Sequence, residues 1–199
     1  VGNSKFEREI LDPFNEKIIN FFSELSKEIS RNKEIYKYPD LMAFAFFCRK
    51  ANLIKLKNKF YETDLKRLGL GIVFHITPSN IPTNFAYSLL FGLINGNSNI
   101  VKVPSKEFPQ ISIICKHINI TLKKYPKIKK MINIIRYSNN DIITKQISLK
   151  CDCRIIWGGD NSIQKIREHP TKPHSLDLTF ADRYSFCLIN TDKLKKISK

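Results

Sequence analysis

Short apolar runs alternate along this sequence with longer segments in which apolar residues recur at helical spacing. The apolar runs at residues 71–76, 99–104, 131–137, 153–157 and 184–190 predict five β-strands. The segments at residues 83–94, 107–124, 140–149 and 160–167 predict α-helices between them. Parallel strands need such helical crossovers, so each strand, helix and strand forms one βαβ unit. The pattern therefore predicts an α/β fold with an open, doubly wound parallel sheet.

The sequence before the first strand has a different pattern, with aromatic and aliphatic residues at helical spacing. Residues 12–30 predict an amphipathic helix that begins with Asp12 as N-cap and Pro13 as its first residue. Its apolar stripe consists of Phe14, Ile18, Phe21, Phe22, Leu25 and Ile29. Residues 40–50 predict a second helix, and a basic segment follows at residues 60–65. We therefore expect residues 1–65 to form a helical segment that packs on a domain formed by residues 66–199.

Positive charge dominates the composition of the 199 residues. Lys and Arg number 34 against 18 Asp and Glu, which gives a formal net charge of +16. A basic protein can bind nucleic acid, and a nucleic-acid-binding α/β module is one interpretation of this charge. The lysines are nevertheless spread along the chain without a long basic block, and no recognition-helix or RNA-binding signature accompanies them. We favour solvated basic surfaces over a nucleic-acid partner.

Cysteine is odd in number and lies in apolar or strand-like contexts, at Cys48, Cys115, Cys151, Cys153 and Cys187. This pattern favours reduced thiols over disulfides and therefore a cytoplasmic protein. Cys151 and Cys153 form a C-x-C pair without a second pair, so we predict no metal site. Cys187 falls inside a predicted strand and is expected in the core. No apolar run approaches the roughly eighteen residues of a membrane helix and no signal peptide opens the chain, so neither a membrane nor secretion is predicted.

Candidate binding residues follow the predicted strands, where a parallel sheet binds its ligands. The dinucleotide fingerprint G-x-G-x-x-G is absent, because Gly69 and Gly71 precede the first strand instead of following it. The loop at residues 77–82, TPSNIP, is stiffened by two prolines around Asn80. The Asn80 amide can donate two N–H bonds, which suits a developing oxyanion. An asparagine in a loop also serves as a turn residue or as a helix N-cap.

Other loop ends carry groups that suit a phosphate or a ribose. Lys102 ends the second strand and offers a cation, although a solvated lysine at a strand end is equally common. Ser105 and Lys106 follow it and can either hold a phosphate or begin a helix. Gly158 and Gly159 form a turn after the fourth strand that lets the backbone approach a ligand, although glycine pairs serve turns in general.

Three segments of the chain together resemble one known family. They are GIVFHITPSNIPTNFAYSLLFGLINGNSNIVKVPSKE, IIWGGDNSIQKIR and LTFADRYSFCLIN. These segments, within residues 68–190, are similar to the LuxC-type fatty-acyl-CoA reductases of bacterial bioluminescence, a branch of the aldehyde dehydrogenase superfamily. The resemblance implies a Rossmann-like cofactor domain without the glycine fingerprint, a catalytic domain after it and a small oligomerisation element. It also implies a homo-oligomer at full length, an acyl-CoA or other activated acyl substrate, and an acyl-transferring protein as a candidate partner.

The resemblance further implies a reaction and the residues that serve it. Reductases of this superfamily transfer an acyl group from CoA to a cysteine, and NADPH then delivers hydride to release an aldehyde. A cysteine suits this step because its thiolate is a strong nucleophile and the thioester keeps an electrophilic carbonyl. By the resemblance, Asn80 takes the role of the oxyanion asparagine, and Thr77, Pro78 and Ser79 of the same loop lie beside the cofactor.

The cofactor residues implied by the resemblance favour NADP(H). Lys102 takes the place of the lysine that binds the adenosine ribose. Ser105, followed by Lys106, stands where NAD-specific relatives carry a glutamate that binds both ribose hydroxyls. A carboxylate there would repel a 2′-phosphate, so its absence favours NADP(H) over NAD(H). The family's glycine turn beside the nicotinamide and pyrophosphate falls on Trp157, Gly158, Gly159 and Asp160.

Two positions depart from the superfamily pattern. Thr179 falls where hydrolytic aldehyde dehydrogenases carry the glutamate that activates water, although a shift of two residues brings Asp177 there. The nucleophilic cysteine of the superfamily lies some tens of residues past the equivalent of Ile189, where this chain has none. The chain also begins without a Met and stops on a lysine-rich segment. We therefore expect the cofactor-binding part of a longer reductase, inactive alone, with its nucleophile beyond Lys199.

Two further interpretations stay open beside the nucleic-acid-binding module. A member of the same family can act on another activated carboxylate, and a remnant with the same fold can have lost its ligand. Saturable binding of NADPH separates the reductase from the remnant. Steeply salt-dependent binding to random duplex DNA would indicate the nucleic-acid-binding module, because neutralised phosphates release counterions.

Overall fold

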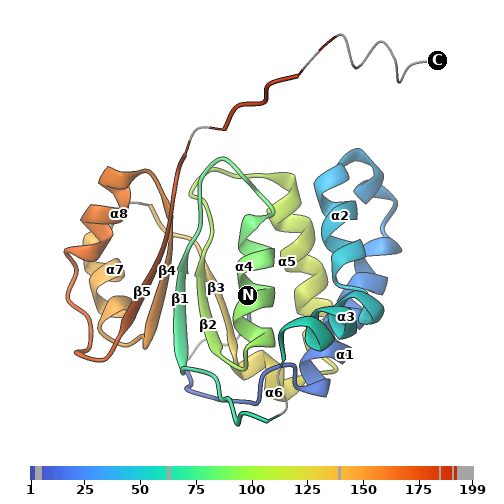
Figure 1. Cartoon of the computed structure of the whole chain (residues 1–199). Coiled ribbons are helices and arrows are strands. Elements are labelled where there is room, and N and C mark those ends of the chain that lie inside the picture. The colour runs from blue at the N-terminus through green and yellow to red at the C-terminus, as the bar shows by residue number, and fades with distance from the viewer. Residues whose placement is uncertain (3–5, 62–63, 139, 184, 190, 192–199) are drawn as a thin grey trace.

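The computed structural model shows a five-stranded parallel sheet with helices on both faces (Figure 1). It describes residues 1–2, 6–61, 64–138, 140–183, 185–189 and 191. The strands are β1 (Ile72–Ile76), β2 (Ser98–Lys102), β3 (Ile132–Ile135), β4 (Cys153–Gly158) and β5 (Leu176–Ala181). Their order is β3-β2-β1-β4-β5, so the chain winds outward from β1 and then returns to add β4 on the other side of β1. The predicted α/β class and doubly wound parallel sheet are confirmed.

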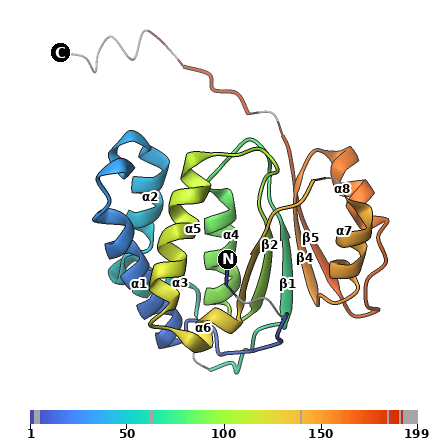
Figure 2. The same cartoon turned by 180° about the vertical axis from the view of Figure 1, so that it is seen from behind.

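Two helical layers enclose the sheet (Figure 2). Helices α4 (Asn84–Ile94) and α5 (Pro109–Leu122) lie on one face, and the short α6 (Pro126–Lys130) leads from α5 into β3. Helices α7 (Asp141–Ser148) and α8 (Asp160–Arg167) lie on the other face. Each face has its own buried apolar cluster, in which Val101 and Ile134 pack toward α4 and α5 while Phe74 and Ile156 pack toward α7 and α8. Continuous burial of both sides explains why these strands read as uninterrupted apolar runs.

The N-terminal helices form a third layer outside α4 and α5 (Figure 1). They are α1 (Glu16–Ser30), the 3-10 helix η1 (Lys33–Lys37), α2 (Pro39–Phe47) and α3 (Lys50–Phe60). Their apolar residues join the same cluster as those of α4 and α5, and Ile18, Phe21, Phe22, Leu25 and Ile29 of α1 are buried in it. The sequence did not indicate α3, because lysines interrupt its apolar pattern and Leu53 is its one buried residue.

Helix α1 begins later than its sequence pattern predicts. Asn15 is its N-cap and accepts a hydrogen bond from the Lys17 N–H, so Asp12 and Pro13 do not begin the helix. Phe14 explains the difference, because its φ of +55° is incompatible with a right-handed helix. The Phe14 N–H donates to the Ile94 carbonyl at 2.6 Å, which docks this segment on the end of α4.

The fifth strand lies earlier in the chain than predicted. Residues 185–189 have no regular secondary structure, and residues 184 and 190 lie outside the described part of the chain. Phe186 and Leu188 are 87% and 88% exposed, and Cys187 is exposed instead of lying in the core. The edge beside β4 is taken by Leu176–Ala181, which pairs with it in parallel from Cys153↔Leu176 to Gly158↔Ala181. High apolarity made residues 184–190 resemble a strand, but backbone pairing decides which segment forms one.

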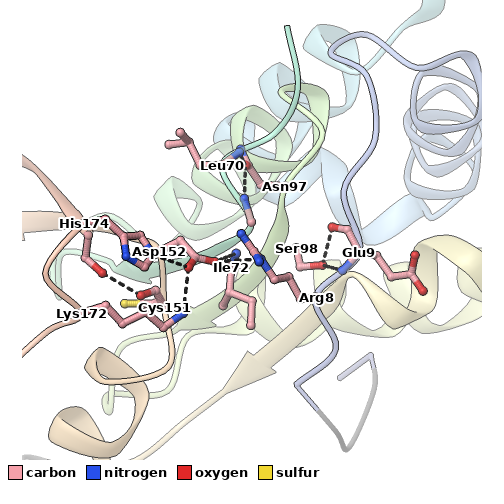
Figure 3. A network of polar contacts seen from close by, with 12 residues as sticks. Arg8, Glu9, Leu70, Ile72, Asn97, Ser98, Cys151, Asp152, Lys172 and His174 are labelled. Atoms are coloured by element: carbon pink, nitrogen blue, oxygen red, sulfur yellow. Dashed lines mark hydrogen bonds and ion pairs between the residues drawn. The ribbon is translucent and has the colours of Figure 1, made fainter.

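Asp152, which is 5% exposed, connects several segments at the amino-terminal edge of the sheet (Figure 3). Its carboxylate accepts hydrogen bonds from the Ile72 N–H at 2.8 Å and from Lys172 Nζ at 2.8 Å. Arg8 Nε lies 3.4 Å from the same carboxylate. Burial alone would raise the pKa of Asp152, but the hydrogen bonds from Lys172 and Ile72 and the positive charges of Lys172 and Arg8 together outweigh it and hold that pKa below its ordinary value. One carboxylate thus joins the N-terminal segment, the start of β1 and the loop before β5.

Candidate functional site

The carboxyl ends of β1, β2 and β4 form the edge of the sheet opposite Asp152. In the parallel register, Ile76 of β1 lies beside Lys102 of β2 and beside Ile156 of β4. The strand order reverses between β1 and β4, because β2 and β3 lie on one side of β1 while β4 and β5 lie on the other. Open α/β sheets bind ligands outside the carboxyl ends of the strands at this switch point. The candidate residues therefore converge on the edge that the fold makes suitable for a ligand.

Thr77 fastens the loop after β1 to the neighbouring strand. Its hydroxyl donates to the Lys102 carbonyl at 2.8 Å, and its N–H approaches the same oxygen at 3.4 Å. Thr77 and Pro78 are half-buried. The first residues of the loop are therefore held against β2 and serve as a rigid base for the residues that follow.

Asn80 lies at the exposed part of this loop, next to exposed Ser79. Helix α4 begins at Asn84 with Thr83 as its N-cap, so Asn80 does not cap this helix. That finding removes one of the two ordinary explanations for an asparagine here and leaves the turn. An exposed amide at the switch point can donate hydrogen bonds to a ligand oxygen.

Lys102 and Ser105 converge on Tyr137 at the end of β3. Lys102 Nζ lies 4.8 Å from the centre of the Tyr137 ring, and the Ser105 hydroxyl donates to the Tyr137 carbonyl at 3.1 Å. The Tyr137 hydroxyl lies 3.0 Å from the Thr144 hydroxyl on α7. Burial lowers the pKa of Lys102 and raises that of Tyr137. Tyr137 was not a sequence candidate, and its only signal was a polar aromatic residue at the end of an apolar run.

Lys106 is directed to a different aromatic ring. Its Nζ lies 5.2 Å from the centre of the Phe108 ring, and its side chain is exposed. Helix α5 begins at Pro109 with Phe108 as its N-cap, so neither Ser105 nor Lys106 begins a helix. Lys106 directly follows Ser105 in the sequence, but its side chain lies at Phe108, whereas Lys102 and Ser105 lie at Tyr137.

The turn after β4 leaves the first turn of α8 uncapped by a side chain. Gly158 has a φ of +155°, a conformation that residues with a side chain rarely adopt. Gly159 is the N-cap of α8 and has no side chain to bond the N–H groups that follow. Asp160 pairs with Arg183 Nη1 at 3.2 Å, so its carboxylate already has a cationic partner. A helix N-terminus with free N–H groups suits a phosphate.

Trp157 points to the opposite face of the sheet from α7 and α8. Its ring stacks on Phe180 of β5, with centroids 4.2 Å apart and planes 11° from parallel. The indole Nε1 is buried and has no hydrogen-bond partner among the described residues. Trp157 therefore lies in β4 by its backbone, just before the turn, and its side chain forms part of an aromatic pair between β4 and β5.

The two residues considered for water activation differ in their surroundings. Asp177 accepts two hydrogen bonds of 2.7 Å from Arg154, which is 2% exposed. Arg154 also donates to the carbonyls of Ile166 and His169 near the end of α8. Thr179 is exposed on the same strand and nearer its carboxyl end. Both oxygens of the Asp177 carboxylate therefore already accept hydrogen bonds from Arg154, so neither is free to orient a water molecule.

The described cysteines offer no activated thiol at the carboxyl edge. Cys48, Cys115, Cys151 and Cys153 are buried or half-buried, and burial raises the pKa of each thiol, to about 11 for Cys115 and Cys153 and about 12 for Cys151. Cys187 is exposed in the segment after β5. Among the residues that the structure describes, no group of three or more His, Cys, Asp or Glu side chains could hold a metal ion. No helix in the same residues is long and apolar enough to cross a membrane.

Comparison with solved structures shows the fold to be that of the aldehyde dehydrogenases. Glyceraldehyde-3-phosphate dehydrogenase GapN from Methanocaldococcus jannaschii, solved with NADP, is 18% identical at a TM-score of 0.62 over 83% of this chain and 41% of that protein. Lactaldehyde dehydrogenase from Escherichia coli is 18% identical at a TM-score of 0.63 over 83% of this chain and 39% of that protein. At this identity the likeness concerns the fold.

Sequence comparison gives the family. A long-chain acyl-protein thioester reductase from Photobacterium leiognathi is 27% identical over 132 residues, which are 65% of this chain and 27% of that protein. Its counterpart from Photorhabdus luminescens is 24% identical over the same share of each. This chain therefore spans about a quarter of the length of these relatives. The acyl-CoA reductase (LuxC) family matches residues 17–199, and the chain belongs to that family.

Proposed function

We propose that this chain is the cofactor-binding part of an NADPH-dependent acyl-CoA reductase, which converts an acyl-CoA and NADPH into an aldehyde, CoA and NADP⁺. The observation that carries the proposal is the convergence of Lys102 and Ser105 on Tyr137 at the switch-point edge of the sheet. The chain that forms this sheet matches the LuxC family. Membership of the family supports the reductase class. The edge supports a dinucleotide, because a cation and a hydroxyl at the end of β2 and an uncapped helix N-terminus after β4 all lie along it.

The residues at this edge fit a nicotinamide dinucleotide with a 2′-phosphate. Lys102 would bind the ribose or its phosphate, and the neutral Ser105 leaves the phosphate unopposed by a carboxylate. The N–H groups that follow Gly159 would receive the pyrophosphate, because that N-cap has no side chain to occupy them. When bound, NADPH supplies the hydride that reduces the acyl group. Thr77 and Pro78 would hold the loop at the nicotinamide end.

Asn80 would serve the acyl group instead of the cofactor. Its exposed amide can donate to the acyl carbonyl oxygen, whose negative charge grows as a nucleophile attacks. Removal of one such donor lowers kcat by about 100-fold to 1,000-fold in enzymes that stabilise an oxyanion. In a form of the protein that includes the nucleophile, Asn80→Ala should therefore slow reduction of acyl-CoA by that order while leaving NADPH binding unchanged. Reduction at the parental rate would contradict this role.

The nucleophilic cysteine is proposed to lie outside the sequence, together with the catalytic domain. Four described cysteines keep their protons because burial raises their pKa, and the chain spans about a quarter of its relatives. Residues 1–65 would then be a helical segment attached to a cofactor domain of residues 66–199. The pairing of Asp177 with Arg154 supports a reductase over a hydrolytic dehydrogenase, because it removes one carboxylate that could activate water.

Fluorescence of Trp157, the one tryptophan in the chain, tests the proposal. The indole lies next to the Gly158 turn, so bound NADPH should quench it saturably by energy transfer, and NADH should do so at higher concentration. Duplex DNA of random sequence, titrated at several salt concentrations, is the comparison for the basic surface. Absence of any NADPH-dependent quenching in folded protein, or tight and salt-dependent DNA binding in its place, would contradict the proposal.

A further inference from the structure

Lys102 is a half-buried cation at the carboxyl edge that contacts an aromatic ring instead of a carboxylate. Its Nζ lies 4.8 Å from the centre of the Tyr137 ring, and within the described part of the chain it forms no ion pair. Glu107, the first carboxylate after it in the sequence, pairs with Arg136 at 2.9 Å. Burial lowers the pKa of Lys102. A partly buried ammonium without a carboxylate partner is suited to an anion that a ligand brings.

The main chain on both sides of Lys102 is fixed to neighbouring strands. The Lys102 carbonyl accepts a hydrogen bond from the Thr77 hydroxyl at 2.8 Å, and the Val103 N–H donates to the Ile135 carbonyl at 3.0 Å. The freedom that remains is that of the lysine side chain, which has many rotamers. Ordering such a side chain when a ligand binds costs free energy. A ring that already holds the ammonium reduces this cost, because fewer rotamers are lost on binding.

Tyr137 is itself held at its main chain and at its hydroxyl. Its carbonyl accepts a hydrogen bond from the Ser105 hydroxyl at 3.1 Å. Its own hydroxyl lies 3.0 Å from Oγ1 of Thr144, a residue of α7 that is 5% exposed. The Thr144 hydroxyl donates its one hydrogen to the Asn140 carbonyl, so the Tyr137 hydroxyl is the donor in the bond between them. The ring is therefore fixed between the end of β3 and α7 and can support a side chain that is otherwise mobile.

We propose that Tyr137 is a positioning residue, which holds the Lys102 ammonium for the 2′-phosphate of NADPH and so favours NADPH over NADH. The inference rests on the proposed cofactor function and adds the residue that prepares Lys102 for this phosphate. The 2′-phosphate brings the negative charge that Lys102 lacks among the described residues, whereas the ribose hydroxyl of NADH brings none. An aromatic ring attracts a cation without neutralising it, so the ammonium keeps its charge for the phosphate.

Calorimetric titration with NADPH and with NADH tests this role. Tyr137→Leu should weaken NADPH binding by about twofold to twelvefold, which corresponds to about 0.5–1.5 kcal/mol for ordering one flexible side chain, and should leave NADH affinity unchanged. Tyr137→Phe keeps the ring and should restore the parental affinity for NADPH. Equal losses for the two cofactors would overturn the proposal, because Tyr137 would then serve a part of the dinucleotide that both share.

A double-mutant cycle shows whether Tyr137 acts through Lys102. Lys102→Met removes the ammonium, so Tyr137→Leu added to it should cause no further loss of NADPH affinity. A loss in the Lys102→Met background as large as that in the parent would overturn the proposal, because Tyr137 would then act independently of the lysine. Tyr36→Leu is the matched control and should leave NADPH affinity unchanged, since Tyr36 is 68% exposed in η1.

A measurement without cofactor keeps this proposal distinct from the proposed function. The Tyr137 ring current should move the NMR signals of the Lys102 Hε protons upfield, and this shift should persist in Tyr137→Phe and vanish in Tyr137→Leu. Unshifted Lys102 signals in the parent would overturn the positioning role. NADPH binding that Tyr137→Leu leaves at parental strength would also overturn that role and leave the cofactor assignment standing. No NADPH binding by the parent, with the upfield shift present, would contradict the cofactor assignment itself.

Discussion

Arg154 and Asp177 form a two-pronged ion pair that joins the edge strand β5 to β4. Arg154 Nε and Nη2 each donate to one oxygen of the Asp177 carboxylate at 2.7 Å. Arg154 Nη1 reaches the carbonyls of Ile166 and His169 at the end of α8 at 2.9 Å and 3.1 Å. One buried side chain therefore holds β5 and the end of α8 in place, and it occupies the carboxylate that could otherwise serve as a base.

Arg154→Met should destabilise the fold strongly. The substitution leaves Asp177, which is 20% exposed, without its main partner, and breaking a buried ion pair from one side costs about 3 to 5 kcal/mol. Chemical denaturation should show this loss in the free energy of unfolding. Arg31→Met is the control, because the Arg31 pair with Glu28 is exposed and should cost less than about 1 kcal/mol. Similar losses in the two variants would contradict the structural role of Arg154.

Acid should begin to destabilise the protein through His75 at about pH 6.5, before most carboxylates titrate. The His75 ring is fully buried between Ser88 Oγ at 2.7 Å and Asn99 Oδ1 at 2.9 Å. Burial lowers its pKa from 6.5 to about 4, so the unfolded chain binds the proton more readily than the folded one. Stability is then lost as pH falls from about 6.5 to about 4, and the loss attributable to His75 at pH 5 is about 2 kcal/mol.

Urea denaturation at pH 7 and pH 5 measures this effect. His75→Gln can keep both hydrogen bonds and cannot titrate, so the pH dependence of its unfolding free energy should be smaller by about 2 kcal/mol between those two values. Burial also lowers the pKa of His117, which contributes to the dependence that both proteins share. Identical pH profiles for the two proteins would show that His75 is not buried in the neutral form.

Two glycine substitutions should differ in cost for a reason visible in the structure. Gly71 has a φ of +127°, and a Cβ there would meet the Asp152 carboxylate, whereas Gly158 has a φ of +155° and a Cβ there would make only an ordinary van der Waals contact with Ser162 Cβ at 3.4 Å. Gly158→Ala should therefore cost only backbone strain, about 1 to 3 kcal/mol, and Gly71→Ala should cost more because it also displaces the Asp152 cluster. Thermal unfolding of both variants checks the order. A more severe loss in Gly158→Ala would contradict it.

Ser105→Glu should reverse the cofactor preference. A carboxylate beside Lys102 would repel a 2′-phosphate and could accept hydrogen bonds from the ribose hydroxyls of NADH. NADPH affinity should fall by at least tenfold while NADH affinity stays equal or improves. Ser105→Ala is the control, since it removes the hydroxyl without adding charge. A Ser105→Glu variant that still prefers NADPH would remove position 105 from the cofactor site.

Several elements of the fold were predictable because strands that are buried on both faces of the sheet appear in the sequence as uninterrupted apolar runs. β1 to β4 and the crossover helices α4, α5, α7 and α8 lie within a few residues of their predicted bounds. β5 was misplaced because its exposed side chains, such as Leu178, alternate with polar Asp177 and Thr179, while residues 184–190 are more apolar. Which segment pairs with β4 depends on the path of the chain after α8, and the local sequence pattern does not indicate that path.

The candidate site was predictable in position but not in its contacts. Strand ends and loop residues placed Thr77, Lys102 and Gly158 at one edge, because parallel strands bring their carboxyl ends together. Tyr137, which lies under Lys102 Nζ, and Arg154, which binds Asp177, depend on packing between segments far apart in sequence. Side-chain partners of this kind follow from the folded arrangement and leave no spacing signal.

Calorimetric titration of NADPH into the parent chain, Lys102→Met and Lys123→Met tests the central claim most directly. Lys123 is exposed at the end of α5, so its substitution removes the same charge away from the carboxyl edge. We predict saturable binding with one NADPH per chain, a loss of at least tenfold in affinity for Lys102→Met, and parental affinity for Lys123→Met. No binding by the parent chain, or equal losses in the two variants, would contradict a cofactor site at this edge of the sheet.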